Sequence, residues 1–142
     1  MKYFKKITVL SLSSVLLPLA AQAKPTPPKD PVVPEGKIIV LQDQIDYRSE
    51  GLNNKRVFVF NGQMMVLFAM KAGQSMPEHS TEEPAYLEVL HGEILVVTGD
   101  KVQKIRAGEA ILLPAHHPHK VDATADSKFI LIRTVPKPGN QK

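Results

Sequence analysis

The sequence contains no cysteine and no tryptophan, and it has few aromatic residues of any kind. Without cysteine the chain can form no disulfide framework, carry no lipid on a lipobox and use no thiol nucleophile. Serine, histidine and aspartate all occur, but no G-x-S-x-G motif marks one serine as a nucleophile. The fold must therefore be stabilised by packing, and we assign no catalytic residue from these motifs.

An excess of charge of one sign is also lacking. The chain has 18 basic and 14 acidic residues, but three of the basic residues, Lys2, Lys5 and Lys6, lie in the N-terminal segment described next. Removing these three leaves 15 basic against 14 acidic residues, a net charge of +1. No basic stripe with interleaved aromatic residues remains, so we expect no nucleic-acid partner.

The first 23 residues are typical of a secretory signal peptide. Three lysines precede an apolar run from Ile7 to Ala20, and Ala21-Gln22-Ala23 forms a small-x-small cleavage site. A membrane anchor is the alternative, but about 14 apolar or small residues, interrupted by Pro18, fall short of the roughly 20 that span a bilayer. We expect a periplasmic or secreted protein that has no membrane association once residues 1–23 are removed.

A proline-rich segment follows. Residues 24–36, KPTPPKDPVVPEG, contain five prolines and few large apolar side chains. Proline lacks an amide donor and fixes φ, so this segment is predicted to be an extended linker. The remaining length suits one domain of ordinary size, which we place at residues 37–136, with a short C-terminal tail at 137–142.

The domain is predicted to be all-β and antiparallel. Short runs rich in β-branched and large apolar residues end in turn residues, and none has the 3.6-residue periodicity of a long helix. Asn61-Gly62 suits a two-residue type I′ hairpin, and Gly99-Asp100 suits a similar turn. About eight strands at this spacing favour a barrel or sandwich. The predicted strands are residues 37–42, 55–60, 63–70, 86–90, 93–97, 101–106, 109–114 and 128–135.

The histidines are clustered, which indicates a site. All five lie within a 41-residue window of the 142-residue chain, namely His79, His91, His116, His117 and His119. The methionines of the apolar runs are interpreted as core residues rather than as the lining of a flexible pocket. These are Met64, Met65, Met70 and Met76.

The segments around the histidines resemble the two short motifs of the cupin superfamily. The first motif, G-x5-H-x-H-x3-4-E-x6-G, is matched at Gly73, His79 and Gly92. The second, G-x5-P-x-G-x2-H-x3-N, is matched at Gly108, Pro114 and His119. The resemblance implies a cupin-type β-barrel, which is a jelly-roll-like double-stranded β-helix, and it implies a homodimer.

The metal ligands that this resemblance implies are only half present. In the family a metal is usually held by both histidines and the glutamate of the first motif and by the histidine of the second. This chain keeps His79 and His119 but has Thr81 and Ala85 at the other two positions. Threonine is a poor ligand for a transition metal and alanine is none. We therefore predict no firm cofactor, and at most a weakly bound divalent transition metal on His79 and His119.

Substitute ligands are present nearby. His117 precedes Pro118, which favours extended backbone, so His117 and His119 could face the same way. His116 takes the place of the family's turn glycine, where the backbone could require a positive φ. For all of these side chains the favoured interpretation is solvent exposure rather than a ligand role, with His116 and His117 as turn residues, Glu82 and Glu83 as loop charges and His91 on the surface.

Three functions stay open at this point. The first is a small-molecule-binding cupin, with His79, His119 and His117 as polar contacts at the barrel mouth. Its aliphatic walls, chosen by strand alternation, are Leu87, Val89 and Leu112. The second is a metal-dependent dioxygenase, isomerase or lyase that acts on a small oxygenated substrate through an unusual third ligand. The third is a structural or interaction protein without a working pocket.

Overall fold

The computed structural model describes residues 33–134 of the chain. The predicted signal peptide (1–23), most of the predicted linker (24–36) and the whole predicted C-terminal tail (137–142) lie outside this range. The described residues form one 3-10 turn and nine strands. They are η1 (Leu41–Gln44), β1 (Asn53–Phe60), β2 (Gln63–Met70), β3 (Ser75–His79), β4 (Ala85–His91), β5 (Glu93–Thr98), β6 (Lys101–Arg106), β7 (Ala110–Leu113), β8 (His119–Ala123) and β9 (Ser127–Thr134).

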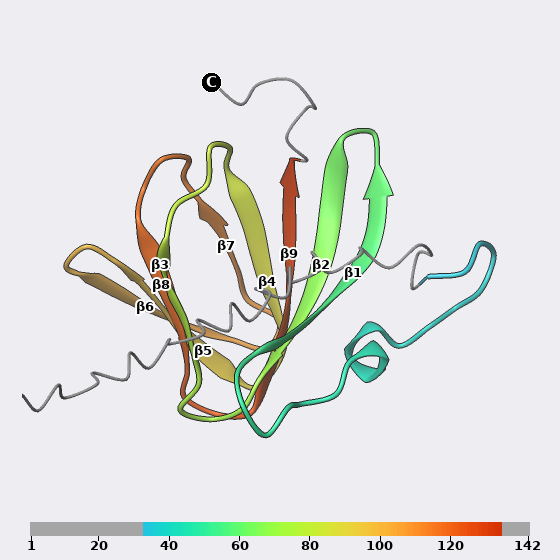
Figure 1. Cartoon of the computed structure of the whole chain (residues 1–142), viewed down its shortest axis with the longest axis horizontal. Helices are drawn as coiled ribbons and strands as arrows, with labels where there is room; N and C mark the ends of the chain where they lie inside the picture. The colour runs from blue at the N-terminus through green and yellow to red at the C-terminus, as the bar shows by residue number, and fades with distance from the viewer. Residues whose placement is uncertain (1–32, 135–142) are drawn as a thin grey trace, which may run out of the picture.

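The strands make two antiparallel sheets that face each other (Figure 1). The five-stranded sheet has the order β1-β2-β9-β4-β7, and the four-stranded sheet has the order β3-β8-β5-β6. The predicted all-β antiparallel barrel is therefore confirmed. Within residues 33–134, no helix has the length and hydrophobicity needed to cross a bilayer.

Seven of the eight predicted strands are present, with ends that differ by up to two residues. The prediction for residues 37–42 is wrong, because this run joins no sheet and continues into η1, with Ile38 and Val40 exposed. β-Branched composition gives a strand only where a neighbouring strand completes the ladder. Two strands were missed: β3 contains Pro77, which an edge strand tolerates, and β8 alternates polar with apolar residues.

The main core fills the space between the two sheets. It is built from inward-facing side chains of β2 and of all six strands from β4 to β9. The largest fully buried members are Phe129, Met70, Leu87, Ile94 and Leu113. Phe68 stacks on Phe129 with 5.1 Å between ring centroids, which extends the core toward β1. Burial of this apolar surface is the main stabilising term in a chain without disulfides.

A second apolar cluster covers the outer face of the five-stranded sheet. Ile45 of the N-terminal segment, by which we mean residues 33–52 before β1, packs there against Val57, Leu67 and Ile130. Three side chains of the sheet donate hydrogen bonds to backbone carbonyls of this segment. Lys128 donates to Gln42 at 2.7 Å, and from β1 Lys55 and Asn53 donate to Gln44 and Asp46. Strand β2, near the middle of the sheet, is therefore covered on both faces. This explains why β2 reads as an almost continuous apolar run instead of an alternating one.

Four connections between the sheets meet at one end of the barrel, which we call the closed end (Figure 1, bottom of the view). They are residues 71–74, 91–93, 107–109 and 124–126. Backbone hydrogen bonds join them: Gly73 N–H donates to the Ala123 carbonyl at 2.9 Å, and Ala107 N–H donates to the Gly92 carbonyl at 3.1 Å. Hydrogen bonds from Lys104 and Thr124 hold the pKa of Glu93 in the same region below its usual range.

The opposite end of the barrel, which we call the open end, carries three of the other connections (Figure 1, top of the view). These are the β1–β2 hairpin and the loops 80–84 and 114–118. The hairpin turn has positive φ at both Asn61 (49°) and Gly62 (74°), as a type I′ turn requires, so this prediction is confirmed. One hydrogen bond, from His116 N–H to the Thr81 carbonyl at 2.8 Å, joins the two loops.

Gly92 is where the closed end is most tightly packed, which gives a stability prediction. Its φ is +78°, and an added Cβ would overlap the Asp126 carbonyl oxygen and lie 2.6 Å from Ser127 Oγ. Because strain and overlap each cost roughly 1–3 kcal/mol, Gly92→Ala should destabilise the domain by about 3 kcal/mol or more. We expect thermal unfolding to show a loss of at least about 12 °C.

The matched control is Gly73→Ala. Gly73 has a similar φ of +84°, but an added Cβ there would have no heavy atom within 4 Å. Only the backbone strain remains, so we expect a loss of about 1 kcal/mol. Equal losses at the two glycines would contradict the packed crossing at Gly92.

Candidate functional site

A β-bulge in β3 brings two histidines together at the open end. Met76 pairs with Val121 and His79 pairs with His119, so the two residues between Met76 and His79 oppose the single residue between Val121 and His119. Without the extra residue, His79 would face away from Met76, because successive side chains in a strand alternate between faces. Both histidines instead face the same side, and their ring centroids are 4.5 Å apart.

Backbone carbonyls fix the orientation of both rings. His79 Nδ1 lies 2.8 Å from the Pro77 carbonyl oxygen, and His119 Nδ1 lies 3.0 Å from the His117 carbonyl oxygen. A carbonyl only accepts hydrogen bonds, so each Nδ1 carries the proton. In the neutral ring Nε2 then has the lone pair, which can accept a hydrogen bond from a ligand or bind a metal.

The burial of the two rings differs. His119 begins β8 and is only 3% exposed, and it alternates inward with Val121 and Ala123. His79 ends the edge strand β3 and is half-buried. Within the pair, His119 is therefore the buried ring and His79 is the ring closer to solvent.

The other two positions that bind metal in the family, 81 and 85, have no metal-binding side chain in this protein. Thr81 donates its hydroxyl to the Glu83 carbonyl at 2.7 Å, within the loop 80–84. Ala85 is completely buried in the main core. Across residues 33–134, no group of three His, Asp or Glu side chains is placed to hold a metal ion. The residues present therefore do not fit the four-ligand metal centre that the motifs imply.

The substitute ligands suggested by the sequence do not join the histidine pair. His117 is exposed, in agreement with the solvent-facing interpretation, and its Nδ1 lies 2.9 Å from the Ala115 carbonyl oxygen, so it does not face the same way as the buried His119. Pro118 separates it from β8, and His117 therefore belongs to the loop. His116 has a φ of 59°, as its place at the family's turn glycine suggested. The side chains of Glu82, Glu83 and His91 are exposed, as expected.

The three expected wall residues occupy different environments. Leu87 and Val89 point inward but are each only 1% exposed within the packed core. Leu112 is 65% exposed, and its expected place on the wall is wrong. In β7 the inward positions are Ile111 and Leu113, because Ile111 pairs with the inward Leu87. The alternation used for Leu112 was therefore shifted by one residue.

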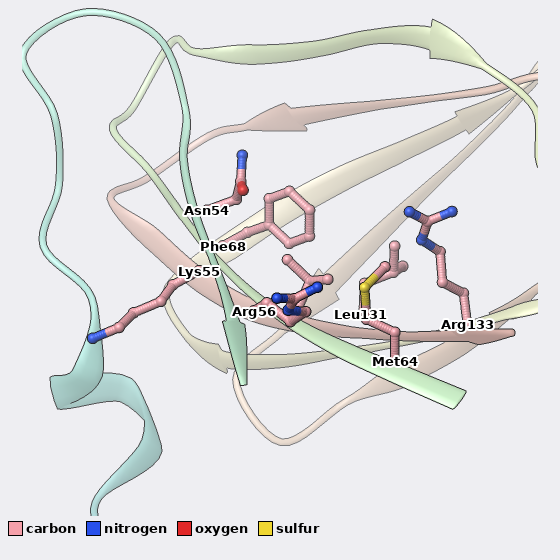
Figure 2. Close-up of a pocket in the computed structure, with 8 residues that line it drawn as sticks. Asn54, Lys55, Arg56, Met64, Phe68, Leu131 and Arg133 are labelled. Atoms are coloured by element: carbon pink, nitrogen blue, oxygen red, sulfur yellow. The ribbon is translucent and has the colours of Figure 1, made fainter. Parts of the chain in front are cut away.

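A cavity of about 420 Å³ lies against the five-stranded sheet (Figure 2). Its lining residues come from β1, β2 and β9 and are Asn54, Lys55, Arg56, Met64, Val66, Phe68, Leu131 and Arg133. Neither histidine is among them. Of the methionines expected in the core, Met70 is completely buried, whereas Met64 lines this cavity.

The strand register shows that most of this lining belongs to the inner face of the sheet. Val66 pairs with Arg56 on one side and with Leu131 on the other, and Leu131 pairs with the buried Leu87. One step toward the open end, Met64 pairs with Arg133. The cavity is thus a continuation of the core face beyond the place where core packing ends.

Sequence reasoning missed the two arginines. A signal was present for Arg133, which directly follows the apolar run from Phe129 to Ile132 in β9, whereas Arg56 follows three polar residues in β1. On β9, Arg133 shares its face with Phe129 and Leu131, both of which contact or belong to the core. The face of Arg56 could not be read in the same way, because a bulge follows it between Arg56 and Phe58.

Comparison with solved structures finds the same fold many times. A cupin superfamily protein from Desulfitobacterium hafniense is 18% identical, with 74% of this chain and 96% of that chain covered and a TM-score of 0.69. An RmlC-like cupin protein from Desulfovibrio desulfuricans is 29% identical, with 69% and 95% covered and a TM-score of 0.62. KdgF from Halomonas sp. is 23% identical, with 67% and 92% covered and a TM-score of 0.58.

A family profile described as the cupin domain matches residues 66–134, from β2 to the end of β9. No curated protein matches the chain. The profile match includes both histidine motifs, and the structural matches share the two-sheet barrel. The chain therefore carries a small cupin-superfamily domain, and the predicted family is confirmed.

Proposed function

We propose that this cupin domain binds a small organic molecule at the open end of its barrel and does so outside the cytoplasm. The observation that carries the proposal is the pairing of His79 with His119 across β3 and β8, with ring centroids 4.5 Å apart. The Nε2 atoms of the two rings can accept hydrogen bonds from a ligand hydroxyl or, when protonated, donate them to a carboxylate.

The surroundings of the pair support a binding role. The inner face of the facing sheet provides an apolar surface at Met64, Val66 and Leu131. Small-molecule sites in general combine apolar walls with a few converging polar groups. A cavity of about 420 Å³ is within the usual size range for such sites.

A metal-dependent enzyme remains the second candidate for one reason. Hydrogen bonds from Nδ1 to a carbonyl are typical of metal-ligating histidines, and both rings have one. A catalytic metal site generally needs three protein ligands, and Thr81 and Ala85 do not supply the third. Non-metal binding is therefore the better supported function.

The binding proposal predicts that both histidines act in the same event. The untagged chain would be screened by thermal shift against a panel of small carboxylic acids, hydroxy acids and sugars. For a compound that stabilises the protein, His79→Ala and His119→Ala should each weaken affinity about 10-fold, because each removes one hydrogen bond to the ligand. His91→Ala is the matched control, since His91 is exposed at the end of β4 and should bind as the unmutated protein does.

The binding proposal would be contradicted if no compound shifted the unfolding temperature at millimolar concentration. It would also be contradicted if the stabilising compounds bound both histidine variants with unchanged affinity. One full equivalent of tightly held metal in the untagged, unmutated chain would instead favour the enzyme.

A gain-of-function variant tests where the two Nε2 atoms point. Thr81→His combined with Ala85→Glu restores the two missing family ligands. The buried glutamate should lower the unfolding temperature, because a carboxylate in the core is poorly solvated. Zn²⁺ at 100 times its Kd should then stabilise the double variant by about 2.7 kcal/mol.

The same Zn²⁺ concentration should raise the unfolding temperature of the unmutated protein far less. Adding His119→Ala to the double variant should remove the Zn²⁺ effect. Equal Zn²⁺ stabilisation with and without His119 would show that the pair does not point to the restored site.

Export is tested by the mass of the mature protein. Because Ala21-Gln22-Ala23 follows the apolar run, cleavage is expected between Ala23 and Lys24. Intact-mass measurement of protein recovered from the periplasm or medium should give a chain that begins at Lys24. A chain that retains residues 1–23 would favour the membrane anchor.

A further inference from the structure

We propose that Arg56 and Arg133 bind the anionic group of the ligand, so that the ligand is a small organic anion with an apolar body. This inference rests on the proposed function, since it assigns the ligand class of the same open end. It concerns residues on the five-stranded sheet that neither histidine motif includes.

The two arginines lie on the strands on either side of β2. Arg56 of β1 is aligned with Val66 of β2, and Arg133 of β9 is aligned with Met64 of β2. The arginines therefore flank β2 from both sides and are one inward position apart along the strands. With strands about 4.8 Å apart, their Cα atoms are separated by roughly 12 Å, which allows both guanidinium groups to reach one small anion over β2.

The charged residues that line the cavity are all basic. No aspartate or glutamate is among the eight residues that line the cavity. Within residues 33–134, Arg133 has no carboxylate at ion-pairing distance. The third basic residue, Lys55, donates to the Gln44 carbonyl at 3.0 Å, and its side chain points toward the N-terminal segment (Figure 2). The positive charge of the inner face thus comes from the two arginines.

The guanidinium groups lie beside an apolar surface in the same cavity. Arginine donates in a planar fork that matches two oxygens of a carboxylate or phosphate. Between and below the arginines lie Met64, Val66 and Phe68, which offer an apolar surface to the rest of the ligand. A molecule with an anionic group at one end and an aromatic or aliphatic body fits both features.

Benzoate is a suitable probe because its neutral analogue benzamide has nearly the same shape. Binding would be followed by NMR of ¹³C-methyl methionine in the purified, untagged chain. Met64 lines the cavity, whereas the adjacent Met65 packs on the outer face of the same strand and serves as an internal control. We expect benzoate to shift the Met64 methyl signal but not that of Met65, and to bind about 10-fold more tightly than benzamide.

Variants separate an arginine contact from a general charge effect. Arg133→Gln and Arg56→Gln should each weaken benzoate about 10-fold and leave benzamide unchanged. Arg106→Gln is the matched control, because it removes the same charge from an exposed residue that pairs with Glu93. Arg133→Glu should reverse the preference, so that benzylammonium shifts Met64 more than benzoate does. Phenyl phosphate distinguishes a phosphate ligand from a carboxylate, since tighter binding than benzoate would assign a phosphate.

The outcomes distinguish this inference from the proposed function. If benzoate binds no more tightly than benzamide, or shifts Met64 in no sample, the arginine site is overturned. If both probes then bind and His79→Ala and His119→Ala weaken both, the proposed function stands alone. If benzoate binding depends on Arg133 but on neither histidine, the arginine site stands and the histidine pocket fails.

Discussion

The close approach of chain segments at Gly92 is the constraint on which the rest of the barrel depends. Four connections between the sheets pass this region, and Ser127 Oγ accepts a hydrogen bond from Glu93 N–H at 3.0 Å between two of them. A side chain at position 92 would occupy the place of the Asp126 and Ser127 backbone. Backbone groups satisfy one another and pack closely here, so the core is closed at this end of the barrel. The paired histidines and the cavity beside Arg56 and Arg133 lie toward the opposite end.

The middle of the five-stranded sheet is covered on both faces, which makes charged residues on its inner face informative. The N-terminal segment covers the outer face through Ile45 and its neighbours, and the main core fills most of the inner face. An arginine placed inward on such a sheet loses hydration unless a polar partner or an open cavity receives it. Arg56 and Arg133 lie at the edge of the packed core, where the cavity begins. The position of Arg133, which has no carboxylate at ion-pairing distance within residues 33–134, therefore needs an explanation that an arginine on a solvent-facing strand would not need.

The sequence predicted the fold and the histidine pair but not the facing wall. Motif spacing placed His79 and His119 in one site, and pairing of β3 with β8 brings their rings together. Periodicity could not show which residues face them, because one-residue bulges change the face of every later side chain in a strand. Such a bulge separates Arg56 from Phe58. Leu112 was misplaced for a similar reason, because the phase of a short edge strand is set by its partner β4.

The substitution of Ala85 for a family ligand changes the physical character of the open end. In this chain the small apolar side chain is completely buried and joins the core, so packing extends to a position that would otherwise hold a carboxylate. Removing one acid from the interior also removes a negative charge that would have attracted a cation and repelled an anion. The same substitution that weakens a metal centre thus makes the barrel interior more favourable for an anionic ligand. Two imidazoles on one sheet and two guanidinium groups on the other are consistent with that change.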